Sequence, residues 1–210
     1  GNAGSIGGGD LQWMTAGSGI MHEEMPQATD ERLDGFQLWV NLPARHKMTT
    51  PRYRGVTAAH IPVVNRDGGV TIRIIAGAVD GVNGAVSDIF AGPSYLDVSM
   101  PAGASFEQPV QRGHNAFIYI FQGEAEVGTA ESEAGRIVGS PRLVVLGDGD
   151  SVRVETKDGP ARFLLLSGQP LHEPIARYGP FVMNTSEESE AALRDLRNGT
   201  FVKVGAEISG

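Results

Sequence analysis

The 210-residue sequence contains no cysteine, which excludes disulfide bonds and thiolate metal ligands and leaves the compartment unreadable from redox chemistry. A transition-metal site would have to be built from histidine and carboxylate side chains. The sequence also lacks a run approaching the ~18 apolar residues of a membrane span. No charged segment followed by an apolar one opens it, although a shortened start would hide such a leader. We therefore expect a cytoplasmic protein with no membrane segment.

Positive charge is scarce as well. The 17 Lys and Arg residues face 25 Asp and Glu residues, which gives a formal net charge of −8. Direct nucleic-acid binding depends on a basic surface, so this composition argues against it. A role at DNA would require a protein partner. The sequence also lacks a phosphate-binding loop, a hydrolase nucleophile elbow and a calcium loop with the required spacing.

What is present is a series of short apolar runs separated by Gly, Pro and Asp turns, which is typical of an antiparallel barrel or sandwich. Alternation or continuous apolar character predicts strands over residues 36–42, 70–74, 95–100, 116–121, 125–128, 142–146, 151–155 and 161–167. We expect residues 116–121 to be buried on both faces and to end in a turn at 122–124. The one convincing helix begins with the capping box of Thr185 and Glu188 and stops at Gly199.

The most informative residues are His22 and Glu24, two positions apart in an apolar, strand-like context. Side chains at i and i+2 of a strand share a face, so both would point into a barrel. An imidazole and a carboxylate on one face are two ligands for a transition metal. An isolated His-x-Glu is more often a packed histidine and a solvated carboxylate, so the surrounding sequence decides between the two interpretations.

That surrounding sequence, Gly-Asp-Leu-Gln-Trp-Met-Thr-Ala-Gly at 9–17 and Gly-Ile-Met-His-Glu-Glu-Met-Pro at 19–26, resembles the pirin family of bicupins. Further segments resemble the same family and extend the match over nearly the whole chain: 35–43, 113–119, 146–150, 168–175 and 179–185. The resemblance implies an all-β fold of the cupin superfamily, with two tandem antiparallel β-barrels and one short C-terminal helix.

One departure concerns the metal site. Pirins carry a further N-terminal segment with a His-Pro-His-Arg-Gly-Phe-type motif, whose two histidines complete the site with the residues matching His22 and Glu24. This chain has no such segment and begins at Gly1. We expect a fragment or trimmed chain with a truncated first barrel.

The stretch from Pro43 to Pro62 contains three prolines and no sustained period, which predicts a connection between barrels. We assign residues 1–57 to the remainder of the N-terminal metal-binding barrel, 58–62 to the linker, and 63–210 to the C-terminal barrel with its helix.

The remaining histidines are weak substitutes for missing ligands. His46 lies between two cations, which disfavours a metal ion, and His60 is expected to be a surface residue of the linker. His114 opens a strand but has no nearby His-x-His or carboxylate, and His172 lies in an extended segment between prolines, where a packing role is expected. The second barrel is predicted to be free of metal.

The resemblance implies two functions from different classes. Several pirins are quercetin 2,3-dioxygenases that open a flavonol with O2 and release carbon monoxide. In that reading His22 is a metal ligand, Glu24 is a ligand and the acceptor of the 3-hydroxyl proton, and Fe(II) is the expected metal, with Mn, Ni or Cu as alternatives. Other pirins are iron-dependent transcriptional co-regulators that bind protein partners. A third reading is an inactive, metal-free fragment with exposed sheet edges.

Overall fold

The structure is a computed structural model that describes residues 4–25, 34–128 and 135–209. These residues form two compact units. The first contains the chain up to Leu11 together with Val56–Pro170, and the second contains the described parts of Gln12–Gly55 and Leu171–Gly210. Pro26, the last residue of the motif around His22, lies outside the described residues.

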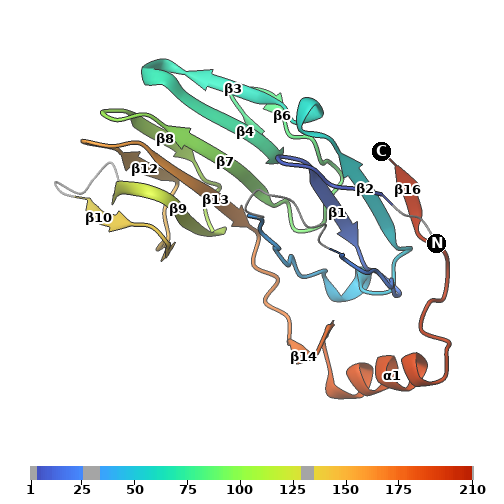
Figure 1. The fold of residues 1–210 in the computed structure, drawn as a ribbon. Coiled ribbons are helices and arrows are strands. Elements are labelled where there is room, and N and C mark those ends of the chain that lie inside the picture. Colours follow the sequence, from blue (N-terminus) through green and yellow to red (C-terminus); the bar gives the residue numbers. More distant parts are fainter. Residues whose placement is uncertain (1–3, 26–33, 129–134, 210) are drawn as a thin grey trace. The chain divides into compact units, whose positions relative to one another are not determined.

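The first unit is built on a curled antiparallel sheet with the order β3-β4-β7-β13-β9-β12-β8, in which β10 and β11 also pair with β9 (Figure 1). A short hairpin, β5 (Ala78–Val79) and β6 (Val82–Asn83), and two single 3-10 turns, Ala58–His60 and Asp67–Gly69, connect its strands. The nine strands of the sheet are β3 (Val63–Arg66), β4 (Val70–Ala76), β7 (Ser94–Met100), β8 (Ser105–Pro109), β9 (Asn115–Gly128), β10 (Arg136–Gly139), β11 (Arg142–Val145), β12 (Ser151–Glu155) and β13 (Ala161–Gly168).

Alternating apolar side chains from these strands form the core of the first unit. The ring of Phe106 meets that of Phe163 edge to face, with 5.6 Å between centroids. Burying each such large side chain contributes about 1.5–3 kcal/mol. The largest fully buried side chains of the core are Val70, Ile72, Ile74, Val79, Leu96, Val98, Met100, Phe106, Ile118, Ile120, Phe163 and Leu165. The predicted strands at 70–74, 95–100, 142–146, 151–155 and 161–167 are confirmed by this sheet.

The central strand β9 differs from its prediction in two ways. It continues through Gly123, where a turn was predicted, and pairs with β13 along its first part and with β10 and β12 beyond it. Gly123 has φ +72°, and a Cβ there would lie 1.9 Å from the carbonyl oxygen of Pro160. The expectation of burial on both faces is also wrong, because Phe117 and Tyr119 are only half-buried while Ile118 is fully buried.

The second unit contains a three-stranded sheet of order β1-β2-β16, formed by β1 (Leu11–Thr15), β2 (Arg52–Val56) and β16 (Glu207–Ser209). The strand β16 pairs with β2 in parallel, with Ile208 opposite Tyr53. Its other elements are a 3-10 turn at Ala44–His46, the hairpin of β14 (Ala176–Tyr178) and β15 (Phe181–Met183), and the helix α1 (Ser186–Arg197).

The helix α1 follows the prediction closely. The Thr185 hydroxyl accepts a hydrogen bond from the Glu188 backbone N–H, and the Glu188 carboxylate accepts one from the Thr185 N–H, which completes the capping box. Gly199, with φ +71°, follows the C-cap residue Asn198. In the part of the chain that the structure describes, no helix is long and apolar enough to cross a membrane.

Two local predictions are wrong. Residues 36–42 form no strand, and Phe36, Leu38 and Val40 are exposed, because no neighbouring strand among the described residues pairs with them. The stretch 43–62 is not an irregular linker throughout, since β2 lies within it.

The compact units are not the linear division predicted from the sequence. The change of unit between Gly55 and Val56 lies close to the predicted boundary at residue 57, but residues 171–210 cluster with 12–55 rather than with the preceding strands. A compact unit is defined by contacts and a barrel by its strand order, so the assignment of 1–57, 58–62 and 63–210 to two barrels and a linker stays a prediction.

Candidate metal site

His22 and Glu24 follow a tight turn at the end of β1. The strand stops at Thr15, so the two residues lie in a segment without regular secondary structure rather than on the predicted strand. Gly17 makes the turn possible, because it has φ +52° and a Cβ there would lie 2.2 Å from the carbonyl oxygen of Thr49. The backbone N–H of Ser18 donates to that same oxygen at 2.8 Å. The glycine-rich sequence after β1 therefore sets the path of the chain toward His22.

The structure brings the two predicted ligands together. His22 Nδ1 and Glu24 Oε1 are 3.9 Å apart, and their side chains are 43% and 58% exposed. With metal–ligand bonds of about 2.1 Å, two ligand atoms lie about 3.4 Å apart in tetrahedral geometry and about 3.0 Å apart as neighbours in octahedral geometry, so His22 Nδ1 and Glu24 Oε1 would have to approach each other by about 0.5–0.9 Å to share one ion. The imidazole and the carboxylate are ligand types that divalent transition ions bind.

Gln37, a residue that the sequence did not single out, also contacts this pair. Gln37 Nε2 donates a hydrogen bond to Glu24 Oε1 at 3.5 Å. Gln37 lies in the segment 35–43, whose resemblance to the family was the only available signal. Because the amide holds one carboxylate oxygen, it can fix the orientation of Glu24 toward an ion or substrate.

Among residues 4–25, 34–128 and 135–209, no group of three or more His, Cys, Asp or Glu side chains could hold a metal ion. The other histidines lie apart from the His22–Glu24 pair in sequence and have their own surroundings. His46 Nε2 accepts from Arg45 Nε at 3.0 Å, and His60 Nδ1 lies 2.8 Å from Thr57 Oγ1. His114 is half-buried just before β9, and His172 is exposed with φ +53°.

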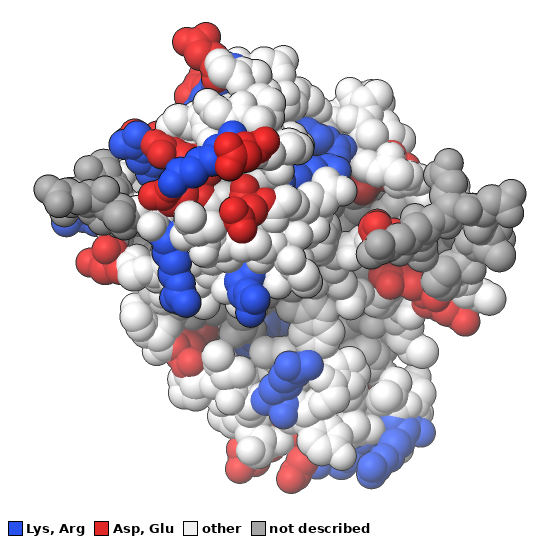
Figure 2. All heavy atoms as spheres, turned by 60° about the vertical axis from the view of Figure 1, so that its left-hand side comes forward, with Lys and Arg blue, Asp and Glu red and all other residues white. Residues whose placement is uncertain are grey.

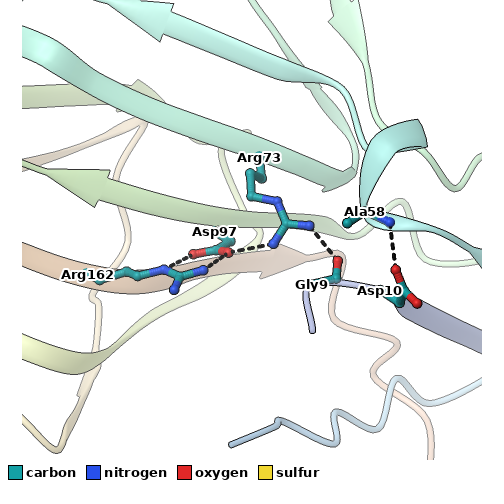
Figure 3. A network of polar contacts seen from close by, with 6 residues as sticks. All are labelled: Gly9, Asp10, Ala58, Arg73, Asp97 and Arg162. Carbon is teal, nitrogen blue, oxygen red and sulfur yellow. Dashed lines mark hydrogen bonds and ion pairs between the residues drawn. The ribbon is translucent and has the colours of Figure 1, made fainter. Parts of the chain in front are cut away.

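The residues immediately before β1 are anchored within the first unit by a polar network (Figure 3). Asp10 accepts hydrogen bonds from the backbone N–H groups of Gly7 and Ala58, both at 2.8 Å, and these bonds hold the pKa of Asp10 below its usual value. Arg73 donates to the carbonyl oxygen of Gly9. The Gly-Asp that opens the family motif thus serves to fix the chain.

The same network continues across the sheet to a buried carboxylate. Asp97, only 6% exposed, accepts two hydrogen bonds from Arg162, at 3.0 and 2.7 Å, and one from Arg73 at 3.3 Å. Hydrogen bonding to Asp97 raises the pKa of Arg162, whose guanidinium also lies 5.2 Å from the centre of the Phe121 ring. Two cations sharing one carboxylate leave this cluster with a net positive charge.

In the second unit, a buried lysine links two distant parts of the chain. Lys47 is 6% exposed and donates to Asn41 Oδ1 at 2.6 Å. Burial lowers the pKa of Lys47, while the carboxylates of Glu173 and Glu188 act in the opposite direction. Glu173 also accepts from the backbone N–H of Ala44 at 2.7 Å. These contacts tie residues 41–47 to the segment that leads into α1.

Charges on the surface are mixed in sign. On the face drawn in Figure 2, acidic and basic side chains mix in one group, and others lie apart from it. Ion pairs of the first unit include Lys157 Nζ with Glu126 Oε2 at 2.7 Å and Arg112 with Asp150 at 2.7 Å.

Comparison with known proteins decides the family. The model of the Pirin family matches residues 1–40, and that of the Pirin C-terminal cupin domain matches residues 95–202. A pirin-like protein of Caulobacter vibrioides is 45% identical over 204 residues, which cover 96% of this chain and 71% of that relative. The chain belongs to the pirin family. The resemblance stated from its motifs is thereby confirmed.

Two further comparisons concern a named relative and a solved structure. The Homo sapiens protein named Pirin is 43% identical over 201 residues, covering 94% of this chain and 67% of that protein. A crystal structure titled as quercetin 2,3-dioxygenase from Acinetobacter baumannii matches with a TM-score of 0.75 and 32% identity, covering 92% of this chain and 67% of that one. The predicted all-β cupin fold is confirmed.

Proposed function

We propose that this pirin-family chain contributes to a metal-dependent dioxygenase that opens a flavonol such as quercetin with O2 and releases carbon monoxide. The observation that carries the proposal is the approach of His22 Nδ1 to Glu24 Oε1 at 3.9 Å. Family membership and the similarity to a structure titled quercetin 2,3-dioxygenase support it.

Fe(II) is the proposed metal, and Mn, Ni or Cu would also suit an imidazole and a carboxylate. When bound, such an ion supplies Lewis-acid activation of the flavonol oxygen and a place for O2 beside it. His22 and Glu24 would be two ligands of this ion, and the resemblance to pirins implies that two histidines of a preceding segment complete the set.

Each residue of the proposed site has a separate task. His22 in its neutral form offers the lone pair of a ring nitrogen and takes no part in proton transfer. Glu24 offers one carboxylate oxygen as a ligand and accepts the proton of the flavonol 3-hydroxyl, which prepares the flavonolate for oxidation. Gln37 holds Glu24 Oε1 and acts as a positioning residue.

The first test is metal retention after anaerobic loading with iron(II) and desalting. We expect about one iron per chain in the unsubstituted protein and a loss of about tenfold or more in His22→Ala and Glu24→Ala. His60→Ala is the matched control, because its ring contacts Thr57 and belongs to the other compact unit. Equal retention in all three variants would reject the assignment of the ligands.

The second test is oxygen uptake and carbon monoxide release with quercetin as the substrate. Turnover that disappears in Glu24→Ala would support the dioxygenase. Iron retained without turnover would reject the dioxygenase, and no retained iron would favour a chain that holds no metal by itself.

A second candidate function is an iron-dependent co-regulator that acts by binding a protein. The observation that favours it is the exposed apolar segment containing Phe36, Leu38, Trp39 and Val40 in the second unit, since exposed apolar patches often mark protein interfaces. Metal-dependent partner binding without flavonol turnover would support this function over the dioxygenase.

A further inference from the structure

The strand β11 (Arg142–Val145) lies at an open edge of the sheet in the first unit. It pairs with β9 on one side, and no strand among the described residues pairs with its other side. An unpaired edge offers backbone N–H and C=O groups to another chain, so sheet edges usually carry charges or proline that block such pairing. This strand has neither a charge nor a proline at Leu143, Val144 or Val145.

The backbone register of β11 determines which residues face the open edge. The N–H of Leu146 donates to the carbonyl oxygen of Ala116 at 3.0 Å. Hydrogen-bonded residues alternate along an antiparallel pair, so Val144 is directed at β9, while the N–H and C=O groups of Leu143 and Val145 point to the open edge. Leu143 is 54% exposed and Val145 is 76% exposed.

These two aliphatic residues also extend an apolar patch. Leu143 lies opposite Tyr119 of β9, and Val145 lies opposite Phe117, both of which are half-buried. Side chains directly opposite each other in an antiparallel pair share one face of the sheet. Exposed apolar patches of this kind mark protein interfaces.

We propose that β11 pairs antiparallel with β11 of a second copy of this chain, around a two-fold axis at Val144. In this register Leu143 lies opposite Val145 of the second copy, so the backbone groups at the open edge bond to each other and the exposed side chains cover one another. A register centred on Leu143 would place Val145 opposite Pro141, which has no N–H to donate. A register centred on Val145 would place Leu143 opposite Gly147, which has no side chain to cover it.

Charges near the ends of β11 also fit a second copy. The register places Arg142 opposite Leu146 of the second copy, two positions before its Asp148. Diagonal neighbours across antiparallel strands lie about 7–8 Å apart, which the long arginine side chain can span. Because this match of opposite charges occurs on both sides of the axis, the edge is complementary to itself. Self-complementarity favours a second copy over a strand of unrelated sequence.

The first measurement is the molar mass by light scattering over a series of protein concentrations. We expect a dimer that dissociates on dilution. Val145→Lys places a charge at the open edge and should raise the dissociation constant at least about tenfold. Since Val145 is exposed, the urea midpoint of unfolding should stay unchanged. Val63→Lys is the matched control, because Val63 is 48% exposed on the edge strand β3, and it should dimerise like the unsubstituted protein.

Disulfide cross-linking tests the register, because the chain has no cysteine of its own. Val144→Cys would face the same residue of the second copy with the Cα atoms about 4.5 Å apart, which a disulfide can bridge. Leu143→Cys is the matched control, because its two Cα atoms would be about 8 Å apart, beyond the reach of a disulfide. Under mild oxidation we expect Val144→Cys to form a linked dimer at least about tenfold faster than Leu143→Cys.

A dimer that Val145→Lys weakens and Val144→Cys cross-links supports the inference. A chain that stays monomeric at every concentration overturns it, including one whose β11 pairs with a different protein instead. A dimer that Val145→Lys leaves intact, or that Leu143→Cys cross-links as readily, also overturns it. None of these measurements involves a metal ion, so their outcome is independent of the proposed function.

Discussion

At the scale of single residues, Asp97 is a charged side chain that is almost fully buried. It is buried on the sheet of the first unit, and its two oxygens accept hydrogen bonds from Arg73 and Arg162. Removing one partner from a buried pair leaves the other charge unpaired, which costs more than the pair itself contributes. The arginines are partly exposed, which moderates that cost.

We therefore expect Asp97→Asn to lower the free energy of unfolding by about 2–3 kcal/mol, measured by urea denaturation. Asp80→Asn is the control, because Asp80 also pairs with an arginine, Arg66, but its side chain is 52% exposed. The control should lose no more than about 1 kcal/mol. Equal losses in the two variants would contradict the role of burial.

Residue-level prediction reached only positions that are close in sequence. The spacing of His22 and Glu24 predicted that they share a face of a strand inside a barrel, whereas they lie 3.9 Å apart in a segment without regular secondary structure, with side chains 43% and 58% exposed. It could not reveal Gln37, which lies 13 residues from Glu24, or the sharing of Asp97 by arginines 24 and 65 residues away. Those contacts depend on how the chain returns to itself, and no local pattern encodes that.

At the scale of elements, Gly123 determines how β9 serves two parts of the curled sheet. Gly123 lies opposite Ala161, and two residues before it the register of β13 against β9 shifts, so that Phe121 is the extra residue between the pairs of Gln122 with Arg162 and Ile120 with Phe163. A bulge of this kind allows one long strand to change partners while both halves keep their ladder hydrogen bonds.

Gly123→Ala should therefore lower the free energy of unfolding for two reasons. Alanine is strained at the left-handed backbone angle of Gly123, and its Cβ would overlap the carbonyl oxygen of Pro160. Gly103→Ala is a matched control, because Gly103 has φ +70° but open space around its Cβ position. We expect Gly123→Ala to lose about 1–3 kcal/mol more than the control in urea unfolding. Similar losses would mean that the backbone angle alone matters at Gly123.

The elements that the sequence predicted well are those whose alternation coincides with burial on one face, such as β4, β7, β12 and β13. Residues 36–42 alternate equally well but form no strand, because a strand also needs a partner to accept its hydrogen bonds. The strand β2 was missed for the opposite reason. Its sequence, Arg-Tyr-Arg-Gly-Val, has little apolar alternation, and pairing with β1 and β16 makes it a strand.

At the scale of the whole molecule, the chain returns after Pro170 to the unit it left at Gly55. Glu173 accepts from the N–H of Ala44, and the Arg177 guanidinium lies 5.2 Å from the Trp39 ring centre. The carboxylates of Glu173 and Glu188 also act electrostatically on Lys47. The linear domain division could not foresee this, because Ala44 and Glu173 are 129 residues apart.

Glu173→Gln should loosen this connection within the second unit. The substitution removes a negative charge that favours protonated Lys47, so the pKa of this buried lysine should fall further. It also replaces the carboxylate that accepts the hydrogen bond from the Ala44 N–H by a weaker, neutral acceptor. We expect amide hydrogen exchange in residues 41–49 to rise about tenfold while β4 and β7 are unchanged. Glu190→Gln, on the exposed side of α1, is the control. A uniform increase across both units would contradict local coupling.

The parallel pairing of β2 with β16 has a consequence for the order of events during translation. About 150 residues separate Val56 from Glu207, and at roughly 5–20 residues per second the ribosome needs about 8–30 s to add them. During that interval the strands β3 to β13 leave the exit tunnel and can assemble. The edge of β2 that pairs with β16 in the folded protein stays unpaired until β16 has been made. The nascent protein should therefore complete its middle first and its beginning last.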